Sequence, residues 1–468
     1  MVEQSIETSR ERQLGLASFG AWDSRPALGR RIGFVSTRLS GTDGVSLETR
    51  KWASVLGAQA HGCFYYAGRC EHPAEQSYIV DQAPFDDRAV DAAGKLAFSQ
   101  RWCEPDMREA TTPERCQGNG RSYPNELRPS ALTRRLRELT EHLKTSLYRY
   151  VREYDLELLI VENALSIPMN LALGVALTEF ISETGLPTIA HHHDFYWERK
   201  RFQANCVADF LDLSFPPRLP SVRHVVISSL AAQQLSWRKG LSSAVIPNVM
   251  DFAHPAPPAD AYARSLRGAL ALADDELLIL QPTRVVQRKG IEHAIELVRR
   301  LGRPARLVIS HAGGDEGGDY PQRVREFAEL LGVRVTIASG LVADERGRAP
   351  DGSRLYTLAD IYSQADLVTY PSHEEGFGNA FLEAIYYRRP LLVNNYLVYA
   401  VDIRPKGFQV IEFEDFLTDR VIRQAQKVLD QPSLAMGMTE TNYELGMRHY
   451  SYAVLEDRLQ AILADLFQ

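Results

Sequence analysis

Short apolar runs alternate with longer amphipathic segments along most of the chain. The short runs are rich in β-branched and aliphatic residues, which is typical of strands buried in a parallel sheet. The segments between them, such as 132–153 and 170–184, repeat apolar residues at a helical period. This alternation predicts an α/β protein with parallel sheets covered by helices. The predicted strands are 31–36, 62–66, 158–162, 188–191, 224–228, 244–246, 277–280, 306–309, 333–337, 367–370, 391–393 and 409–411.

A proline-rich stretch at 247–262, PNVMDFAHPAPPADAY, divides this pattern into two halves, because such sequence cannot continue a helix or strand throughout. Each half predicts one Rossmann-like, doubly wound domain. Two such sheets are expected to face a central cleft, where the carboxyl ends of parallel strands carry ligands. The predicted organisation is a leader at 1–30, a first domain at 31–247 with an insertion at about 69–129, a linker at 248–262, a second domain at 263–445, and a C-terminal helix at 446–468 that crosses back to the first domain.

Composition excludes several classes of protein. The 468 residues include 53 Lys and Arg against 60 Asp and Glu, a formal net charge of −7, and 45% are hydrophobic. These values exclude intrinsic disorder, and no basic cluster indicates nucleic acid or an anionic membrane as a partner. Five cysteines without a Cys-x-x-Cys pair indicate neither a disulfide framework nor a zinc ribbon, so we expect a cytoplasmic protein. No segment is apolar for the ~20 residues that a transmembrane helix needs.

The segment YPSHEEGFGNAFLEAIYYRRPLLV, residues 370–393, carries the strongest chemical signal. A strand is followed by a turn with Gly376 and Gly378, and then by a helix that begins near Asn379. Free N–H groups at a helix start favour an anion or hydroxyl acceptors of hydrogen bonds. Seven residues separate Glu375 from Glu383, which places one carboxylate in the turn and the other about one turn into the helix. Such a pair is suited to a polyhydroxylated ligand.

Two cations follow the first strand of the second half. Arg284 comes directly after that strand and Lys289 stands at the start of the next helix. A guanidinium and an ammonium beside a helix start form a site for a diphosphate. The chain contains no Asp-x-Asp pair. A metal-bridged diphosphate is therefore not predicted, and the two cations must neutralise the phosphate charge.

Two further elements follow strands of the first half. Gly41 and Gly44 permit a loop close to a phosphate, with Thr42 or Ser46 as the cap of the following helix. The other is AHHHDFYWERKRF at 190–202, where three adjacent histidines suggest zinc. Since neighbouring side chains of a strand point to opposite faces, three consecutive histidines do not converge on one ion, and no metal ligand is predicted.

Together these motifs resemble retaining, nucleotide-sugar-dependent glycosyltransferases of the GT-B fold, family 4, in the superfamily of glycogen synthase and sucrose phosphate synthase. In that family Pro-Ser, two residues, Glu-Gly-Phe-Gly, four residues and Glu-Ala precede a closing proline. The sequence departs from the family in having Arg389 where a glycine is usual and in separating the two glycines of the first loop. The matching residues are Pro371, Ser372, Glu375, Gly376, Phe377, Gly378, Glu383, Ala384 and Pro390.

The resemblance implies a role for each motif. Arg284 and Lys289 would take up the charge of the leaving nucleoside diphosphate, and Glu383 would bind the ribose. His193 would lie at the anomeric centre, with His192 as its substitute. No dedicated protein nucleophile is needed in this scheme, and Asp194 or Glu375 is the nucleophile only in a two-step alternative. The predicted catalytic residues are Arg284, Lys289, Glu375 and His193; the donor-binding residues are Gly44, Arg284, Lys289, Glu375, Gly376, Phe377, Gly378 and Glu383; the acceptor residues are Asp194, Tyr196 and Arg199.

The predicted function is therefore a retaining glycosyltransferase that moves a hexose, glucose or mannose, from a nucleoside diphosphate sugar to a hydroxyl acceptor, with no cofactor. Basic residues near the first-domain loops favour a small anionic acceptor such as a glycerate or sugar derivative, and a homodimer is a further expectation. The alternatives are a polysaccharide or cell-wall glycan glycosyltransferase, a GT-B phosphorylase or epimerase, and a non-catalytic sugar-nucleotide-binding protein. An NAD-dependent oxidoreductase is disfavoured, because the nearest match to G-x-G-x-x-G has Phe381 at the third glycine.

Overall fold

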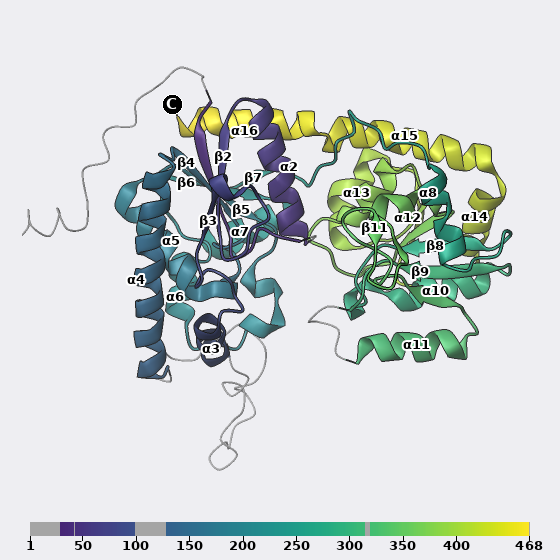
Figure 1. The fold of residues 1–468 in the computed structure, drawn as a ribbon, viewed down its shortest axis with the longest axis horizontal. Helices are drawn as coiled ribbons and strands as arrows, with labels where there is room; N and C mark the ends of the chain where they lie inside the picture. The colour runs from purple at the N-terminus through teal and green to yellow at the C-terminus, as the bar shows by residue number, and fades with distance from the viewer. Residues whose placement is uncertain (1–28, 42, 99–127, 314–318, 468) are drawn as a thin grey trace, which may run out of the picture. The chain divides into compact units, whose positions relative to one another are not determined.

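The computed structural model describes residues 29–41, 43–98, 128–313 and 319–467. The chain divides into two compact units. Among the described residues, unit 1 comprises 29–41, 53–98, 128–224 and 459–467, and unit 2 comprises 43–52, 225–313 and 319–458. Each unit contains a parallel sheet covered by helices (Figure 1). The predicted α/β architecture with two Rossmann-like halves is confirmed.

The first sheet has seven strands in the order β3-β2-β1-β4-β5-β6-β7. The chain begins in the middle of the sheet and moves outward in both directions, so β1 and β4 are neighbours at the point where strand order reverses. All five residues of β4 are buried, as expected of a central parallel strand. The strands are β1 (Arg31–Val35), β2 (Gly62–Ala67), β3 (Ser77–Ile79), β4 (Leu158–Glu162), β5 (Thr188–His192), β6 (Val222–Val226) and β7 (Ala244–Val245).

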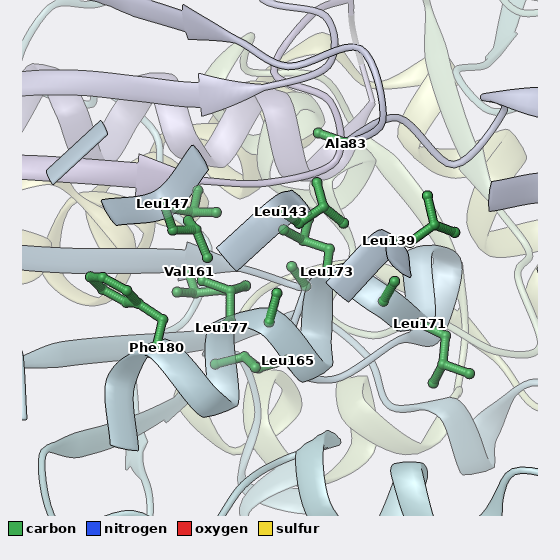
Figure 2. Close-up of a cluster of buried hydrophobic side chains, with 14 of the residues drawn as sticks. Ala83, Leu139, Leu143, Leu147, Val161, Leu165, Leu171, Leu173, Leu177 and Phe180 are labelled. Atoms are coloured by element: carbon green, nitrogen blue, oxygen red, sulfur yellow. The ribbon is translucent and has the colours of Figure 1, made fainter. Parts of the chain in front are cut away.

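Helices α4 (Ser130–Glu153) and α5 (Leu171–Thr184) pack together on this sheet. In α4 a stripe of leucines repeats every three or four residues and is buried, whereas α5 is buried nearly all round. Figure 2 shows leucines of α4 meeting those of α5, with Val161 of β4 among them. This contact of two helices and the sheet forms the core of unit 1. Its labelled residues include Leu139, Leu143, Leu147, Leu171, Leu173, Leu177 and Phe180.

Part of the predicted insertion at 69–129 belongs to the unit 1 framework instead. Strand β3 extends the sheet by pairing with β2, and helix α3 (Arg88–Ala97) buries Val90, Ala93 and Ala97 in the core. A three-residue strand is too short to show an apolar pattern, which is why the sequence did not reveal it. Residues 99–127 of the predicted insertion, and 1–28 of the predicted leader, lie outside the described residues.

The second sheet has six strands in the order β10-β9-β8-β13-β14-β15, again with a reversal, here between β8 and β13. Two predicted strands are displaced by two residues: 224–228 forms β6 at Val222–Val226, and 409–411 forms β15 at Ile411–Phe413. At β6 the difference arises because burial continues past the hydrogen-bonded residues, to Ile227 and Ser228. At β15 the predicted strand began too early, since Gln409 is exposed. The strands are β8 (Leu277–Gln281), β9 (Ala305–Ile309), β10 (Val335–Ile337), β13 (Leu367–Tyr370), β14 (Leu391–Asn394) and β15 (Ile411–Phe413), with a hairpin of β11 (Gly347–Arg348) and β12 (Arg354–Leu355).

Three helices end the chain: α14 (Asp419–Asp430), α15 (Pro432–Tyr450) and α16 (Tyr452–Leu466). The residues from Leu459 onward belong to unit 1, where Asp465 accepts a hydrogen bond of 2.5 Å from Arg223. No described helix is both long and apolar enough to cross a membrane. The remaining α-helices are α2 (Gly44–Ala58), α6 (Ala208–Ser214), α7 (Ser229–Lys239), α8 (Ala261–Arg264), α9 (Leu266–Ala269), α10 (Ile291–Arg300), α11 (Tyr320–Leu330), α12 (Leu358–Gln364) and α13 (Asn379–Tyr386).

Candidate active site

The predicted donor residues of unit 2 gather where its strand order reverses. Arg284 and Lys289 follow β8, and Glu375 follows β13, the neighbouring strand. At such a reversal the segments that follow the two neighbouring strands run in opposite directions. Doubly wound sheets bind ligands at this point, outside the carboxyl ends of the strands. The fold therefore brings together residues 86 positions apart in the sequence.

Lys289 and Glu375 form a buried ion pair. The ammonium Nζ of Lys289 donates to Oε1 of Glu375, and the two side chains are only 10% and 9% exposed. Arg288 adds a second cation, with Nη1 3.5 Å from Oε2 of Glu375. Burial opposes the ionisation of Glu375, but Lys289 and Arg288 outweigh it and hold the pKa of that carboxyl below its usual value. Burial lowers the pKa of Lys289, and Glu375 opposes this shift.

A buried polar network fixes the backbone beneath this pair. Gln281, at the end of β8, donates through Nε2 to Thr283 at 2.9 Å and to the carbonyl of Lys289 at 3.4 Å. Its Oε1 accepts a hydrogen bond of 2.7 Å from Thr369 of β13. One fully buried amide therefore ties β8, β13 and the Lys289 turn together.

Gly290 permits the close approach of the two loops that carry the pair. Its φ is +58°, and a Cβ at this position would lie 2.4 Å from the carbonyl oxygen of Pro371. No L side chain fits in that space, and the left-handed backbone is itself unfavourable for one. The backbone N–H of His373 donates to the carbonyl of Arg288 at 2.8 Å and joins the same loops.

Arg284 is exposed and lies close enough to Lys289 to lower the pKa of that ammonium. Both cations also face His311, whose pKa is lowered by burial first and then by the two cations. The two predicted phosphate ligands are thus near one another. They differ in environment, since Lys289 is buried in an ion pair with Glu375 whereas Arg284 is exposed to solvent.

The glycine-rich turn has one exposed and two buried members. Gly376 is exposed, whereas the ring of Phe377 is buried and packs edge-on against Tyr450 at 5.3 Å between centroids. Phe377 can therefore offer a ligand only its main chain. Gly378 has a φ of +125°, and a Cβ there would lie 2.5 Å from the hydroxyl of Tyr396, so this position also excludes a side chain.

Glu383 lies on α13 and accepts a hydrogen bond of 2.8 Å from the phenol of Tyr362. Burial raises the pKa of Glu383, while Tyr362 and the positive charge of Lys51 oppose the rise. Lys51 itself donates to Glu48 at 2.6 Å and to the carbonyl of Val249 at 2.7 Å. Among the described residues no hydrogen bond or ion pair links Glu383 to the Glu375 pair. The two carboxylates thus form separate parts of the site.

Gly44 begins α2, whose first turn belongs to unit 2. The helix is capped by Asp43, which accepts hydrogen bonds of 3.1 and 3.2 Å from two backbone N–H groups of that turn. The predicted cap was Thr42 or Ser46; Ser46 instead donates to Asp43, and Thr42 lies outside the described residues. A Cβ on Gly44 would lie 3.6 Å from Nδ2 of Asn379, at the start of α13. The Gly44 backbone is therefore beside the helix that carries Glu383.

In unit 1, His193 follows β5 and contacts a buried carboxylate. Glu162, at the end of β4, accepts hydrogen bonds at Oε2 from His191 at 2.9 Å and from His193 at 3.0 Å. His192 points away from them and bonds His224 at 2.9 Å. The argument from alternating side chains holds for His192 but not for His191 and His193, which lie two residues apart on one face. Two imidazoles and a carboxylate within 4.8 Å of one another are a donor set that could hold a metal ion.

The predicted acceptor residues lie on the loop after β5. Arg199 donates from Nε to Asp194 at 2.6 Å and from Nη2 to the same oxygen, so the two groups neutralise one another. The backbone N–H of Tyr196 donates to the carbonyl of Ser166 at 3.0 Å, and its ring packs against the unit 1 core. Asp194 and Arg199 therefore form one charged pair, with Tyr196 beside them in sequence.

Sequence reasoning missed residues that hold these side chains in place. Arg288 and Gly290 lie on either side of the predicted cation Lys289, in a run typical of a turn, so the sequence could have indicated both. Glu162 is the last residue of a predicted strand, where an acidic side chain among apolar ones was a usable signal. Tyr362 and Gln281 carried no signal in the sequence, because their roles depend on contacts between distant segments.

No family model matches the sequence. The chain is 31% identical over 403 residues to mannosylglucosylglycerate synthase of Petrotoga mobilis, with 81% of this chain and 86% of the relative covered. It is 29% identical to mannosylglucosylglycerate synthase of Thermotoga maritima, over 92% of this chain and 98% of that one. Among solved structures, sucrose-phosphate synthase from Thermosynechococcus elongatus matches with a TM-score of 0.62 at 14% identity, covering 94% of this chain and 99% of that one.

The structural likeness confirms the predicted GT-B fold, and the sequence likeness extends over most of both proteins. The chain is therefore an enzyme, a glycosyltransferase, as its motifs predicted. By its identity and coverage it belongs to the glycosyltransferase family that contains mannosylglucosylglycerate synthase.

Proposed function

We propose that this protein transfers a hexosyl unit, mannose or glucose, from a nucleoside diphosphate sugar to a hydroxyl of a small anionic acceptor, with retention at the anomeric carbon, as a member of family 4. The name of the two relatives states a product built from mannose, glucose and glycerate, and we carry that acceptor class over to this chain. The single observation that carries the proposal is the buried pair of Lys289 with Glu375 at the strand reversal of unit 2.

The cations of unit 2 are suited to a nucleoside diphosphate. In this proposal Arg284, Lys289 and Arg288 surround the diphosphate and stabilise the negative charge that grows on it as the sugar leaves. Three cations near one oxyanion make a bridging metal unnecessary, so we propose that transfer needs no metal. Lys289 is already held in place by Glu375, so little rearrangement is needed when charge develops.

The carboxylates are suited to hydroxyl groups of the donor. Glu383 would accept hydrogen bonds from the ribose, and the phenol of Tyr362 holds it in position. Glu375 would accept hydrogen bonds from the sugar, aided by backbone N–H groups at Gly376, Phe377 and Gly378. The backbone of Gly44 would approach the donor phosphate.

Unit 1 would supply the acceptor side. His193 would lie at the anomeric centre, and the loop with Asp194, Tyr196 and Arg199 would meet the acceptor. Because Arg199 is paired with Asp194, an acceptor carboxylate would have to displace or share that partner. The small number of cysteines favours a cytoplasmic location. We also propose a homodimer, which sedimentation analysis would test.

The donor is tested first by thermal unfolding with GDP-, UDP- and ADP-hexoses. A ligand at about 100 times its dissociation constant adds about 2.7 kcal/mol of stability, which gives a readable rise in Tm. The protecting donor is then incubated with glucosylglycerate, glycerate and the uncharged control glucosylglycerol, and the product is analysed by NMR for anomeric configuration. We expect transfer to an anionic acceptor with retention. Equal transfer to the uncharged control, or an inverted product, would contradict the proposal.

A further inference from the structure

A fully buried carboxylate in unit 1 contacts two histidines, one in β5 and one just after it. Glu162 ends β4 and pairs in register with His191 of β5. His193 is two residues beyond His191, so both imidazoles reach the same side of the sheet as the Glu162 side chain. Both contact the one oxygen Oε2, at 2.9 and 3.0 Å.

The next residue, Asn163, holds the backbone of the same histidine. Its φ is +61°, a left-handed conformation that asparagine tolerates better than most residues. Its Oδ1 accepts the backbone N–H of His193 at 2.9 Å, and its Nδ2 donates to Asp194 at 2.8 Å. Consecutive residues at the end of β4 thus fix His193 at both its ring and its main chain.

The charge of Glu162 needs a partner, because an ionised carboxylate with no exposed surface is stable only when it is paired. The charged or titratable groups around it are His191 of β5, His193 just after β5 and, beyond the Asn163 amide, Asp194 with its partner Arg199. Burial opposes the ionisation of Glu162, and the two histidines outweigh it and lower its pKa to about 2. The carboxylate is therefore an anion that holds N–H donors on both rings.

We infer that Glu162 is the positioning residue of His193: its carboxylate orients the imidazole for the hexosyl transfer proposed above, while Asn163 fixes the backbone next to it. This inference rests on the proposed function only in assigning His193 to the reacting centre. The contact itself is independent of the reaction, so the two can be tested separately.

The first test is a double-mutant cycle with Glu162→Gln, His193→Ala and the two combined, measured as kcat and donor KM. Glutamine keeps the shape of the side chain and removes its charge. We expect Glu162→Gln to lower kcat by about tenfold to a hundredfold, the loss that a small misplacement of a reacting group produces. Donor KM should change less than about twofold, and the effect should vanish in the His193→Ala background. An equal loss in both backgrounds would overturn the inference.

The matched control is His224→Gln, which breaks the buried bond to His192. It should lower Tm and leave kcat within about twofold, because His224 is bonded away from Glu162. A loss of kcat equal to that of Glu162→Gln would show that damage to the fold alone explains the effect, and would overturn the inference.

The second test needs no activity and uses histidine-labelled protein followed by NMR. Removing the anion should lower the pKa of the His193 imidazole in Glu162→Gln, since an adjacent carboxylate favours the imidazolium; an unchanged titration would overturn the inference. If the wild type transfers no sugar from any donor, the proposed function fails while this shift still supports the contact. One equivalent of Zn²⁺ bound by the wild type and lost in Glu162→Gln would replace the hydrogen-bonded arrangement with a metal site and overturn the inference.

Discussion

Replacing Lys289 by alanine should lower kcat by about a hundredfold to a thousandfold, the loss seen when one group that stabilises developing charge is removed. The structure adds a second effect. Lys289 is buried and neutralises Glu375, so its removal leaves a carboxylate that is 9% exposed with Arg288, at 3.5 Å, as the nearest described cation. Breaking a buried pair costs about 3–5 kcal/mol, and the remaining Arg288 should reduce this to about 2 kcal/mol.

The catalytic and structural effects can be separated by a double variant. Lys289→Met alone leaves the buried charge of Glu375, whereas Lys289→Met with Glu375→Gln removes both charges at similar volume. Uncharged replacements of a buried pair are often neutral in stability. We therefore expect the double variant to regain Tm but not kcat. The assay is initial-rate transfer at saturating donor beside thermal unfolding, with Lys95→Ala, which removes an exposed lysine of α3, as the control.

Two results would refute this reasoning. If Lys289→Ala kept kcat within about threefold of the wild type, Lys289 would not stabilise the leaving diphosphate, since such groups contribute about a hundredfold or more. If the double variant regained activity together with Tm, the loss in Lys289→Ala would come from the unpaired carboxylate rather than from catalysis.

Three other predictions concern single contacts. Glu383→Gln should raise the donor KM about tenfold or more in steady-state kinetics, because an amide accepts ribose hydrogen bonds less strongly than an anion. Gly290→Ala should lower Tm and abolish donor protection, since its Cβ would meet the carbonyl of Pro371 at 2.4 Å; unchanged Tm would contradict this. Burial lowers the pKa of His224 to about 4 and that of its partner His192 as well, so the unfolded chain binds more protons below pH 6.5. Stability should fall by about 3 kcal/mol between pH 6.5 and pH 4, and denaturant unfolding should show a shallower pH dependence in His224→Gln.

The sequence predicted the fold well because burial and helical period are local signals. Helices α4 and α5, for example, follow from apolar residues that repeat within a window of a few residues. The short edge strand β3 and helix α3 were missed, because their apolar residues are few and interrupted. For the site, the sequence indicated which residues take part but not which of them contact one another. That Lys289 meets Glu375 could not be read from the sequence, since the contact depends on how β8 and β13 lie beside one another.

The pairing of Lys289 with Glu375 also explains how a buried cation can be kept ready for a phosphate. A lysine side chain loses up to about 2 kcal/mol of conformational entropy when it is fixed, and a buried ammonium without a partner would lose its proton. Glu375 removes both obstacles before the donor arrives, because it orients the ammonium and favours its charged form. Its other oxygen, Oε2, lies at a longer distance, 3.5 Å, from Nη1 of Arg288, so the same carboxylate also holds a second cation beside the ammonium. In the proposed function this ion pair would link recognition of the phosphate to recognition of the sugar, so a change to either residue should alter how the enzyme holds both.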